Sequence, residues 1–370
     1  MMTNLNQAHL DIAAASHPGL VGKNNEDRYS VSAFMTGFRG KVPAVFAILC
    51  DGIGGHRAGE IAAQLGVTTV TEVITASDGL QPLETLENAI HRANHAIFEA
   101  SLSVQGHRGM GTTCVCAWVI ADRLYTANLG DSRIYLLRGE HIMQLTTDHT
   151  WLQEAYDAGI ISDAHGGEHP NAHVIRRYLG SARAPQLDFR LWFFDGESDA
   201  EAVENQGLPL EAGDTLLLCS DGLTDLVSDH EIQRLVKSAP LDRAPGALID
   251  LANARGGHDN TTVVLLRVPG EQDQPANRFR KGRILRGCVA GLVLMGLLTL
   301  AIYFGLRWRA PRFDLHGSPT SVATRVLSTQ QPGTPSAAET VPAVIEASPS
   351  PGQEQGPTLT PWPTHTLQNE

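Results

Sequence analysis

Hydrophobic residues in the first 270 positions form short runs of two kinds. Apolar or alternating runs of about five to nine residues are typical of β-strands, whereas apolar residues spaced three or four positions apart are typical of helices. The predicted strands are 10–16, 42–50, 112–120, 133–137, 187–194, 215–219 and 261–268. The predicted helices are 60–74, 83–98, 230–236 and 244–254. Strands come in groups with pairs of helices between them, which favours an α+β fold of antiparallel sheets with helices outside over a doubly wound parallel sheet.

Residues 287–306 follow neither pattern, because these twenty positions carry no charged side chain. At about 1.5 Å per residue, a helix of that length crosses a hydrocarbon core of about 30 Å. Basic residues flank it, five before and three after: Arg278, Arg280, Lys281, Arg283 and Arg286, then Arg307, Arg309 and Arg312. This bias, without a signal peptide at the N-terminus, predicts a single-pass membrane protein whose residues 1–286 are cytoplasmic.

The segments around this run complete the predicted organisation. Residues 307–370 are rich in Pro, Ser and Thr and poor in large apolar side chains, which predicts a disordered tail outside the cell. We therefore divide the chain into a globular domain (1–270), a basic juxtamembrane linker (271–286), a transmembrane helix (287–306) and this tail.

Charge narrows the range of partners. The formal net charge is −12, and residues 1–277 alone carry 19 basic against 35 acidic side chains. So acidic a domain repels phosphate backbones, which argues against nucleic acid as a partner. The five cysteines include no CxxC pair and are too irregularly placed for a disulfide framework, so reduced thiols are expected. The excess of acidic side chains in residues 1–277 suits a domain that binds divalent cations.

Acidic residues recur where the predicted strands end or begin. Carboxylates held where buried strands emerge, beside glycines that let backbone approach closely, suit hard, oxygen-preferring cations such as Mg²⁺ or Mn²⁺. A single Asp-Gly step would most often mark only a turn. The recurring positions are Glu26, Asp27, Asp51, Asp131, Asp221, Asp225 and Asp259.

The complete series of motifs is far more specific than any one of them. The series is Asn25-Glu26-Asp27, Asp51-Gly52-Ile53-Gly54-Gly55-His56, Gly109-Met110-Gly111-Thr112-Thr113, Gly130-Asp131-Ser132-Arg133, Asp221-Gly222-Leu223-Thr224-Asp225 and Asp259-Asn260. In this order it resembles the metal-dependent serine/threonine protein phosphatases of type 2C, over roughly residues 10–268. The resemblance is to the bacterial branch, in which one transmembrane helix often tethers such a domain.

The resemblance implies a four-layer α-β-β-α sandwich with a metal centre in a cleft at one end. Two divalent cations, Mn²⁺ or Mg²⁺, are implied there, with a third held more loosely. The segment from about 150 to 180 corresponds to a flexible flap beside the cleft. The implied ligands are Asp51 bridging the pair, the Gly52 carbonyl, Asp221 and Asp259, with Glu26 acting through water and Asp131 and Asp225 holding the third ion.

The predicted chemistry follows from charge. A phosphate monoester dianion repels hydroxide, so a catalyst must neutralise charge and generate hydroxide at neutral pH. Two divalent ions do both, and no protein nucleophile is then required. We interpret Ser132, Ser220 and Cys219 as structural, because none has the partner histidine that nucleophilic catalysis demands. The predicted activity is hydrolysis of phosphoserine and phosphothreonine in proteins by a metal-activated water, opposing Ser/Thr kinases.

Two positions depart from the family pattern. Members usually carry an arginine five residues before the Asp of the Asn-Glu-Asp motif, where it grips the substrate phosphate, and here that position is Gly22. The adjacent Lys23 is the candidate replacement, although its ammonium is a point charge rather than a bidentate fork. Animal members place a general-acid histidine directly after Asp-Gly, where this chain has Ile53. His56 is the nearest histidine, and both a catalytic role and a structural role in a bacterial-type turn stay open for it.

Three functional interpretations are compatible with the sequence. The leading one is a membrane-anchored phosphatase that acts on phosphorylated proteins, Ser/Thr kinases and their substrates among them. The missing arginine supports a metal-binding pseudophosphatase that holds phosphoproteins without turnover, although every metal ligand is present. A receptor whose outer tail senses a ligand and whose inner domain reports it is compatible with the first interpretation.

Overall fold

The computed structural model describes residues 8–21, 24–37, 39–53, 58–161, 169–194 and 196–270. All of them belong to the first of two compact units into which the chain divides, residues 1–293. The predicted linker, transmembrane helix and tail lie outside the described residues. Among the described helices, none is long and apolar enough to span a membrane.

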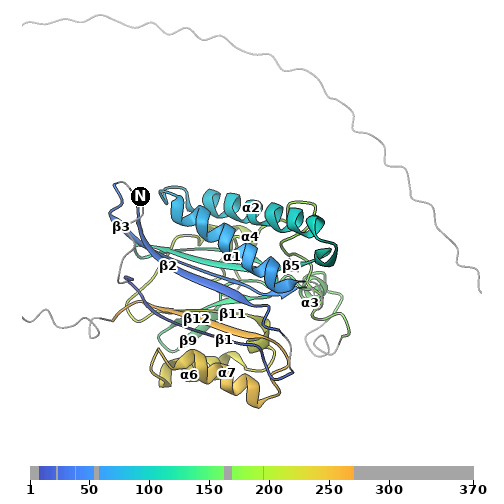
Figure 1. Cartoon of the computed structure of the whole chain (residues 1–370). Helices are drawn as coiled ribbons and strands as arrows, with labels where there is room; N and C mark the ends of the chain where they lie inside the picture. The colour runs from blue at the N-terminus through green and yellow to red at the C-terminus, as the bar shows by residue number, and fades with distance from the viewer. Residues whose placement is uncertain are drawn as a thin grey trace, which may run out of the picture. The chain divides into compact units, whose positions relative to one another are not determined.

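Two five-stranded antiparallel sheets form the centre of this unit (Figure 1). The first sheet has, in spatial order, β1 (Asp11–His17), β12 (Thr261–Arg267), β11 (Thr215–Cys219), β8 (Arg133–Arg138) and β9 (His141–Gln144). The second sheet has β10 (Leu208–Pro209), β7 (Arg123–Leu129), β6 (Cys114–Ile120), β3 (Val42–Cys50) and β2 (Arg28–Thr36). A separate short ladder pairs β4 (Gly52–Ile53) with β5 (Gly111–Thr112).

Helices cover the outer face of each sheet. The second sheet packs against α1 (Gly59–Ala76) and α2 (Pro82–Ser103), and the first against α6 (Asp229–Ser238) and α7 (Ala244–Ala254) (Figure 1). The shorter elements are η1 (Gln105–His107), α3 (Trp151–Asp157), α4 (Asp199–Glu204) and α5 (Asp221–Thr224). The prediction of two antiparallel sheets with flanking helices is therefore confirmed.

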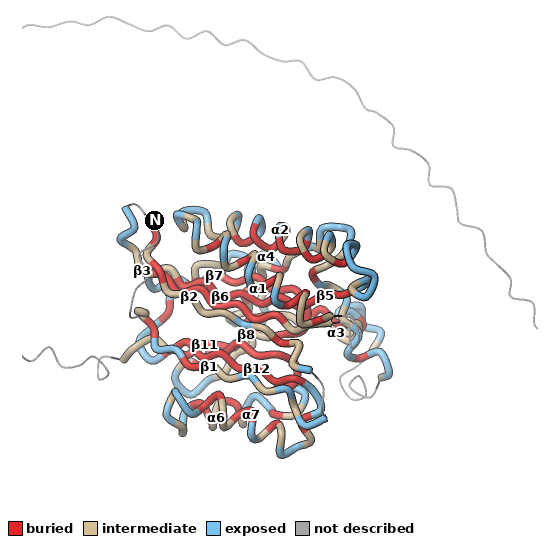
Figure 2. Tube along the Cα trace, in the orientation of Figure 1, coloured by how far each residue is buried: buried red, intermediate tan, exposed pale blue. Residues whose placement is uncertain are grey.

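The core has three layers, one between the sheets and one beneath each pair of helices (Figure 2). Strand β3 serves two of them, because successive side chains on a strand point to opposite faces. Val45 and Leu49 lie between the sheets, whereas Phe46 and Ile48 pack beneath α1 and α2. A strand buried on both faces is a continuous apolar run. For this reason the sequence predicts β3 and β11 with their correct bounds.

The predicted strand at 187–194 is wrong. This segment is extended, but its backbone N–H groups bond to three separate partners. Asp188 bonds the Asn128 carbonyl, whereas Leu191 and Trp192 bond the carbonyls of Ala202 and Leu145. A ladder needs successive bonds to one neighbouring strand, so none forms beyond an isolated bridge.

Strand β2 has no counterpart among the predicted strands. Only two of its nine residues are buried, and polar and apolar residues are mixed along it. An edge strand of this kind lacks the apolar run that marks a central strand.

Candidate active site

Strand direction brings the acidic motifs to one end of the two sheets. Strands β3 and β11 end there, at Cys50 and Cys219. Strands β2, β8 and β12 begin there, because Cys50 pairs with Arg28, and Cys219 pairs with both Arg133 and Val263. Each acidic motif lies within a few residues of one of these strand ends. We call this region the acidic end; its carboxylates are Glu26, Asp27, Asp51, Asp131, Asp221, Asp225 and Asp259.

Carboxylates at the acidic end repel one another. Burial raises the pKa of Asp51 well above its usual range, and repulsion from Asp27, Asp221, Asp131 and Asp259 raises it further. Burial and the same kind of repulsion raise the pKa of Asp221. The five aspartates are therefore close enough to act as one electrostatic group.

Two of these carboxylates hold a buried oxygen atom, Oδ1 of Asp27 and of Asp131, that has no hydrogen-bond partner in the described part of the chain. Burial raises the pKa of Asp27 to about 6, although its Oδ2 accepts a 2.8 Å hydrogen bond from Ser220. Burial, with repulsion from Asp148, raises the pKa of Asp131 to about 7. A buried carboxylate oxygen is costly to leave unpaired, so both positions suit a cation.

The motif glycines give the backbone room to pack at this end. A Cβ atom on Gly52 would lie 2.5 Å from the Gly59 carbonyl and 2.9 Å from the Glu26 carbonyl oxygen. A Cβ atom on Gly222 would collide with the Asn260 carbonyl. Neither glycine has a positive φ, so steric room is what each supplies. Asn260 links the last acidic motif to the first, since its Oδ1 accepts the Glu26 N–H at 2.6 Å.

A small pocket of about 90 Å³ opens between Asp131, Asp221 and Asp225. Two residues that the sequence did not single out also line it, Asp148 and His173. The Asp148 carboxylate is neutralised by Arg133, whose Nε lies 2.9 Å from Oδ1. His173 Nδ1 lies 3.8 Å from Asp225 Oδ2 and brings the predicted flap region to the pocket. No sequence signal marks His173, because a lone histidine in a loop has many roles.

Some predicted positions cannot be placed. Gly22, Lys23 and His56 lie outside the described residues, as does the part of the flap region at 162–168. Among the described His, Cys, Asp and Glu side chains, no group of three stands at the mutual spacing of ligands around one metal ion. The fit of the acidic end to cations therefore rests on its oxygen donors, on the Oδ1 atoms of Asp27 and Asp131 that lack a partner among the described residues, and on the mutual repulsion of its aspartates.

Comparison with known sequences identifies relatives over this whole domain. The family described as protein phosphatase 2C matches residues 19–155. The serine/threonine phosphatase Stp of Listeria innocua is 33% identical over 270 residues, covering 72% of this chain and 95% of that protein. The serine/threonine protein phosphatase PstP of Mycobacterium tuberculosis is 35% identical over 286 residues, covering 76% of this chain and 48% of PstP.

Solved structures agree with the sequence relatives. A crystal structure of M. tuberculosis PstP/Ppp has a TM-score of 0.59 and 33% identity, covering 70% of this chain and 99% of that one. The PstP catalytic domain in complex with two manganese ions has a TM-score of 0.56 and 34% identity, covering 70% and 97%. With the two-sheet fold and the acidic end, these likenesses define an enzyme of the protein phosphatase class. The chain belongs to the protein phosphatase 2C family.

Proposed function

We propose that this chain hydrolyses phosphoserine and phosphothreonine in proteins, in a reaction that depends on divalent cations bound at the acidic end. One observation carries the proposal: the aspartates at the acidic end repel one another, and the two buried ones, Asp27 and Asp131, each hold an oxygen without a partner among the described residues. A protein gains nothing in stability from such a cluster, so a function must explain it. The family membership and the manganese-bound PstP domain support the same conclusion.

The donor set indicates which cations fit. All candidate ligands are oxygens, which match Mn²⁺ or Mg²⁺ better than softer metals. Bound cations would neutralise phosphate charge and activate water for attack on phosphorus. The residues proposed to hold the pair are Asp51, the Gly52 carbonyl, Asp221 and Asp259, with Glu26 acting through water and Asp131 and Asp225 at the looser third position.

Neighbouring side chains hold the carboxylates in place rather than attack phosphorus. The Ser220 hydroxyl donates to Asp27 and accepts the Thr262 N–H at 2.9 Å, so both its hydrogen-bonding roles are used in the protein. The Ser132 hydroxyl is buried 2.9 Å from the hydroxyl of Thr113. These contacts support attack by water, with no serine nucleophile. Lys23 stays our candidate for contact with the substrate phosphate.

Chelation tests the proposal directly. Full-length protein in detergent should dephosphorylate a phosphothreonine peptide with Mn²⁺, fall to background in excess chelator, and recover when Mn²⁺ is returned. Full turnover in excess chelator would show that the acidic end is not a metal centre. Tight phosphopeptide binding without turnover in Mn²⁺ would identify the pseudophosphatase instead.

We also propose that the enzyme is anchored in the cell membrane with its catalytic domain in the cytoplasm, where it opposes Ser/Thr kinases. The uncharged run 287–306 and the basic residues before it support this topology. Protease added outside intact cells should remove an epitope placed at the C-terminus and spare one placed at the N-terminus. The reverse pattern would invert the topology.

A further inference from the structure

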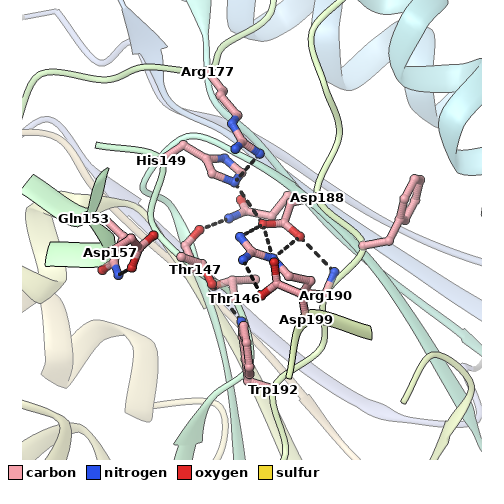
Figure 3. A network of polar contacts seen from close by, with 12 residues as sticks. Thr146, Thr147, His149, Gln153, Asp157, Arg177, Asp188, Arg190, Trp192 and Asp199 are labelled. Carbon is pink, nitrogen blue, oxygen red and sulfur yellow. Dashed lines mark hydrogen bonds and ion pairs between the residues drawn. The ribbon is translucent and has the colours of Figure 1, made fainter. Parts of the chain in front are cut away.

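A network of polar contacts joins His149 to the segment 188–192 (Figure 3). Thr150, the residue after His149, lines the pocket between Asp131, Asp221 and Asp225, which we call the acidic pocket. His149 is at the centre of the network and is almost completely buried. Its Nδ1 accepts the backbone N–H of Gly130 at 3.1 Å, so Nδ1 carries no proton. The proton of the neutral ring is therefore on Nε2, which lies 3.1 Å from Asp188 Oδ2 and 3.4 Å from Arg177 Nη1. Because a guanidinium has no acceptor atom, the Nε2 proton is donated to Asp188.

Asp188 is held as a charged acceptor for that proton. The Arg190 guanidinium donates through Nε at 2.9 Å and 3.0 Å to the two carboxylate oxygens, and the Arg190 backbone N–H adds a bond at 2.9 Å. Burial alone would raise the pKa of Asp188, but the bonds from His149 and Arg190 lower it below its usual range. A fixed carboxylate on one ring nitrogen sets the tautomer, and so makes the other nitrogen an acceptor.

The contact between His149 and Gly130 runs in both directions. While the ring accepts the Gly130 N–H, the His149 backbone N–H donates to the Gly130 carbonyl at 2.8 Å. Gly130 has φ +105°, and a Cβ atom there would lie 2.6 Å from the side chain of Thr113. The turn is thus held by His149 on one side and by Thr113 on the other. Thr113 Oγ1 in turn accepts the Asp51 N–H at 2.9 Å.

The residue after Gly130 is Asp131, which lines the acidic pocket. Its Oδ1 has no hydrogen-bond partner among the described residues. The direction of this carboxylate is therefore set by the turn that carries it.

We propose that His149 is a positioning residue, whose neutral, Asp188-oriented ring holds the Gly130–Asp131 turn so that Asp131 presents its unpartnered oxygen to a divalent cation in the pocket. The inference rests on the proposed metal-dependent function. It assigns part of the cation affinity to a side chain outside the pocket. Loss of a residue that orients a metal ligand typically weakens metal binding about 10- to 100-fold.

Two substitutions separate the two ring nitrogens. His149→Asn places an amide oxygen near the position of Nδ1 and keeps an acceptor for Gly130. His149→Gln places an amide nitrogen near the position of Nε2 and keeps a donor for Asp188, but loses the Gly130 bond. Mn²⁺ binding to full-length, metal-stripped protein is measured by calorimetry without substrate. We expect His149→Gln to weaken the Asp131-dependent site about tenfold or more, and His149→Asn to stay within about threefold of wild type.

Controls distinguish this inference from its parent proposal. Asp131→Asn identifies the titration step that belongs to the pocket, and His95→Asn substitutes an exposed histidine on α2. Equal Mn²⁺ affinities of the Gln and Asn variants would overturn the positioning role. If wild type binds no Mn²⁺ at all, the proposed function itself fails.

A measurement on wild type needs no variant to fold. The ¹⁵N shifts of labelled His149 should show a protonated Nε2 and an unprotonated Nδ1. A protonated Nδ1 would overturn the inference, because the ring could not then accept the Gly130 N–H.

Discussion

Asp131 and Asp188 are equally buried but have opposite electrostatic surroundings. Asp131 is 5% exposed, its Oδ1 has no partner among the described residues, and burial raises its pKa to about 7. Asp188 is 6% exposed, accepts bonds from Arg190 and His149, and has a lowered pKa. Among the described residues, an arginine bonds both oxygens of Asp188, whereas Oδ1 of Asp131 has no hydrogen-bond partner.

The two sites show that this fold places stabilising and functional carboxylates in separate regions. A buried carboxylate that is paired with an arginine has its charge and hydrogen bonds satisfied by the protein itself. At the acidic end, the buried oxygens Asp27 Oδ1 and Asp131 Oδ1 have no partner among the described residues, so a cation from solution would supply the missing contact. Because His149 contacts both Asp188 and the Gly130–Asp131 turn, the paired carboxylate Asp188 helps to position Asp131.

The strongest loss of activity is expected from a substitution at the acidic end. Asp221→Asn removes a carboxylate charge that we propose holds a catalytic cation. The kcat toward a phosphothreonine peptide should therefore fall about a thousandfold or more. The thermal midpoint in chelator should stay the same or rise, since repulsion from the neighbouring aspartates is relieved. Asp122→Asn, at an exposed aspartate, is the matched control. A rate within about threefold of wild type would rule out the assignment of Asp221 as a metal ligand.

A second prediction concerns stability and removes the ion pair between Asp188 and Arg190. Asp188→Asn leaves the Arg190 guanidinium, whose side chain is 19% exposed, without its main counter-ion. We expect the free energy of unfolding to fall by about 3 kcal/mol, as measured by urea titration. Asp199 also pairs with Arg190 but is 76% exposed, so Asp199→Asn should cost about 0.5 kcal/mol or less. Equal losses in the two variants would show that burial of the pair contributes nothing.

A smaller effect is expected in the pH dependence of stability. Because the pKa of Asp188 is lowered in the folded protein, its contribution to stability is present above the unfolded value of about 3.9. That contribution is lost as the pH falls through the folded pKa, so wild type should lose stability below about pH 4. Asp188→Asn should show a shallower loss between pH 5 and pH 3 in thermal unfolding. Parallel curves for the two proteins would contradict the lowered pKa.

The sequence predicts the acidic end better than the network that supports it. Apart from Glu26 and Asp27, which precede β2, each candidate ligand lies near a strand that is apolar enough to be recognised, and antiparallel pairing then brings those strand ends together. His149 and Asp188 are 39 positions apart and lie in irregular segments. Their contact depends on tertiary packing that no local pattern encodes. The alternation around Asp188 predicts a strand, but this segment bonds three separate partners instead of one neighbouring strand.

Asp27 shows a different limit. The sequence marks it as half of an acidic pair, but favours Glu26 as the ligand. The structure buries Asp27 under Ser220, from a motif 193 positions away, and leaves one of its oxygens unpartnered. Burial of one member of an acidic pair is decided by the neighbouring strand, which the sequence alone does not place.

The pairing of β1 with β12 has a practical consequence for engineering. Asp11 pairs with Arg267, while His17 pairs with Thr261 beside the acidic end. The described domain therefore begins and finishes on adjacent strands at the end remote from the carboxylates. Fusion partners, affinity tags or a surface attachment joined at either boundary would therefore attach away from the acidic end. A short linker between the two boundaries would also permit circular permutation, with new termini opened in an exposed turn such as that at Gly139.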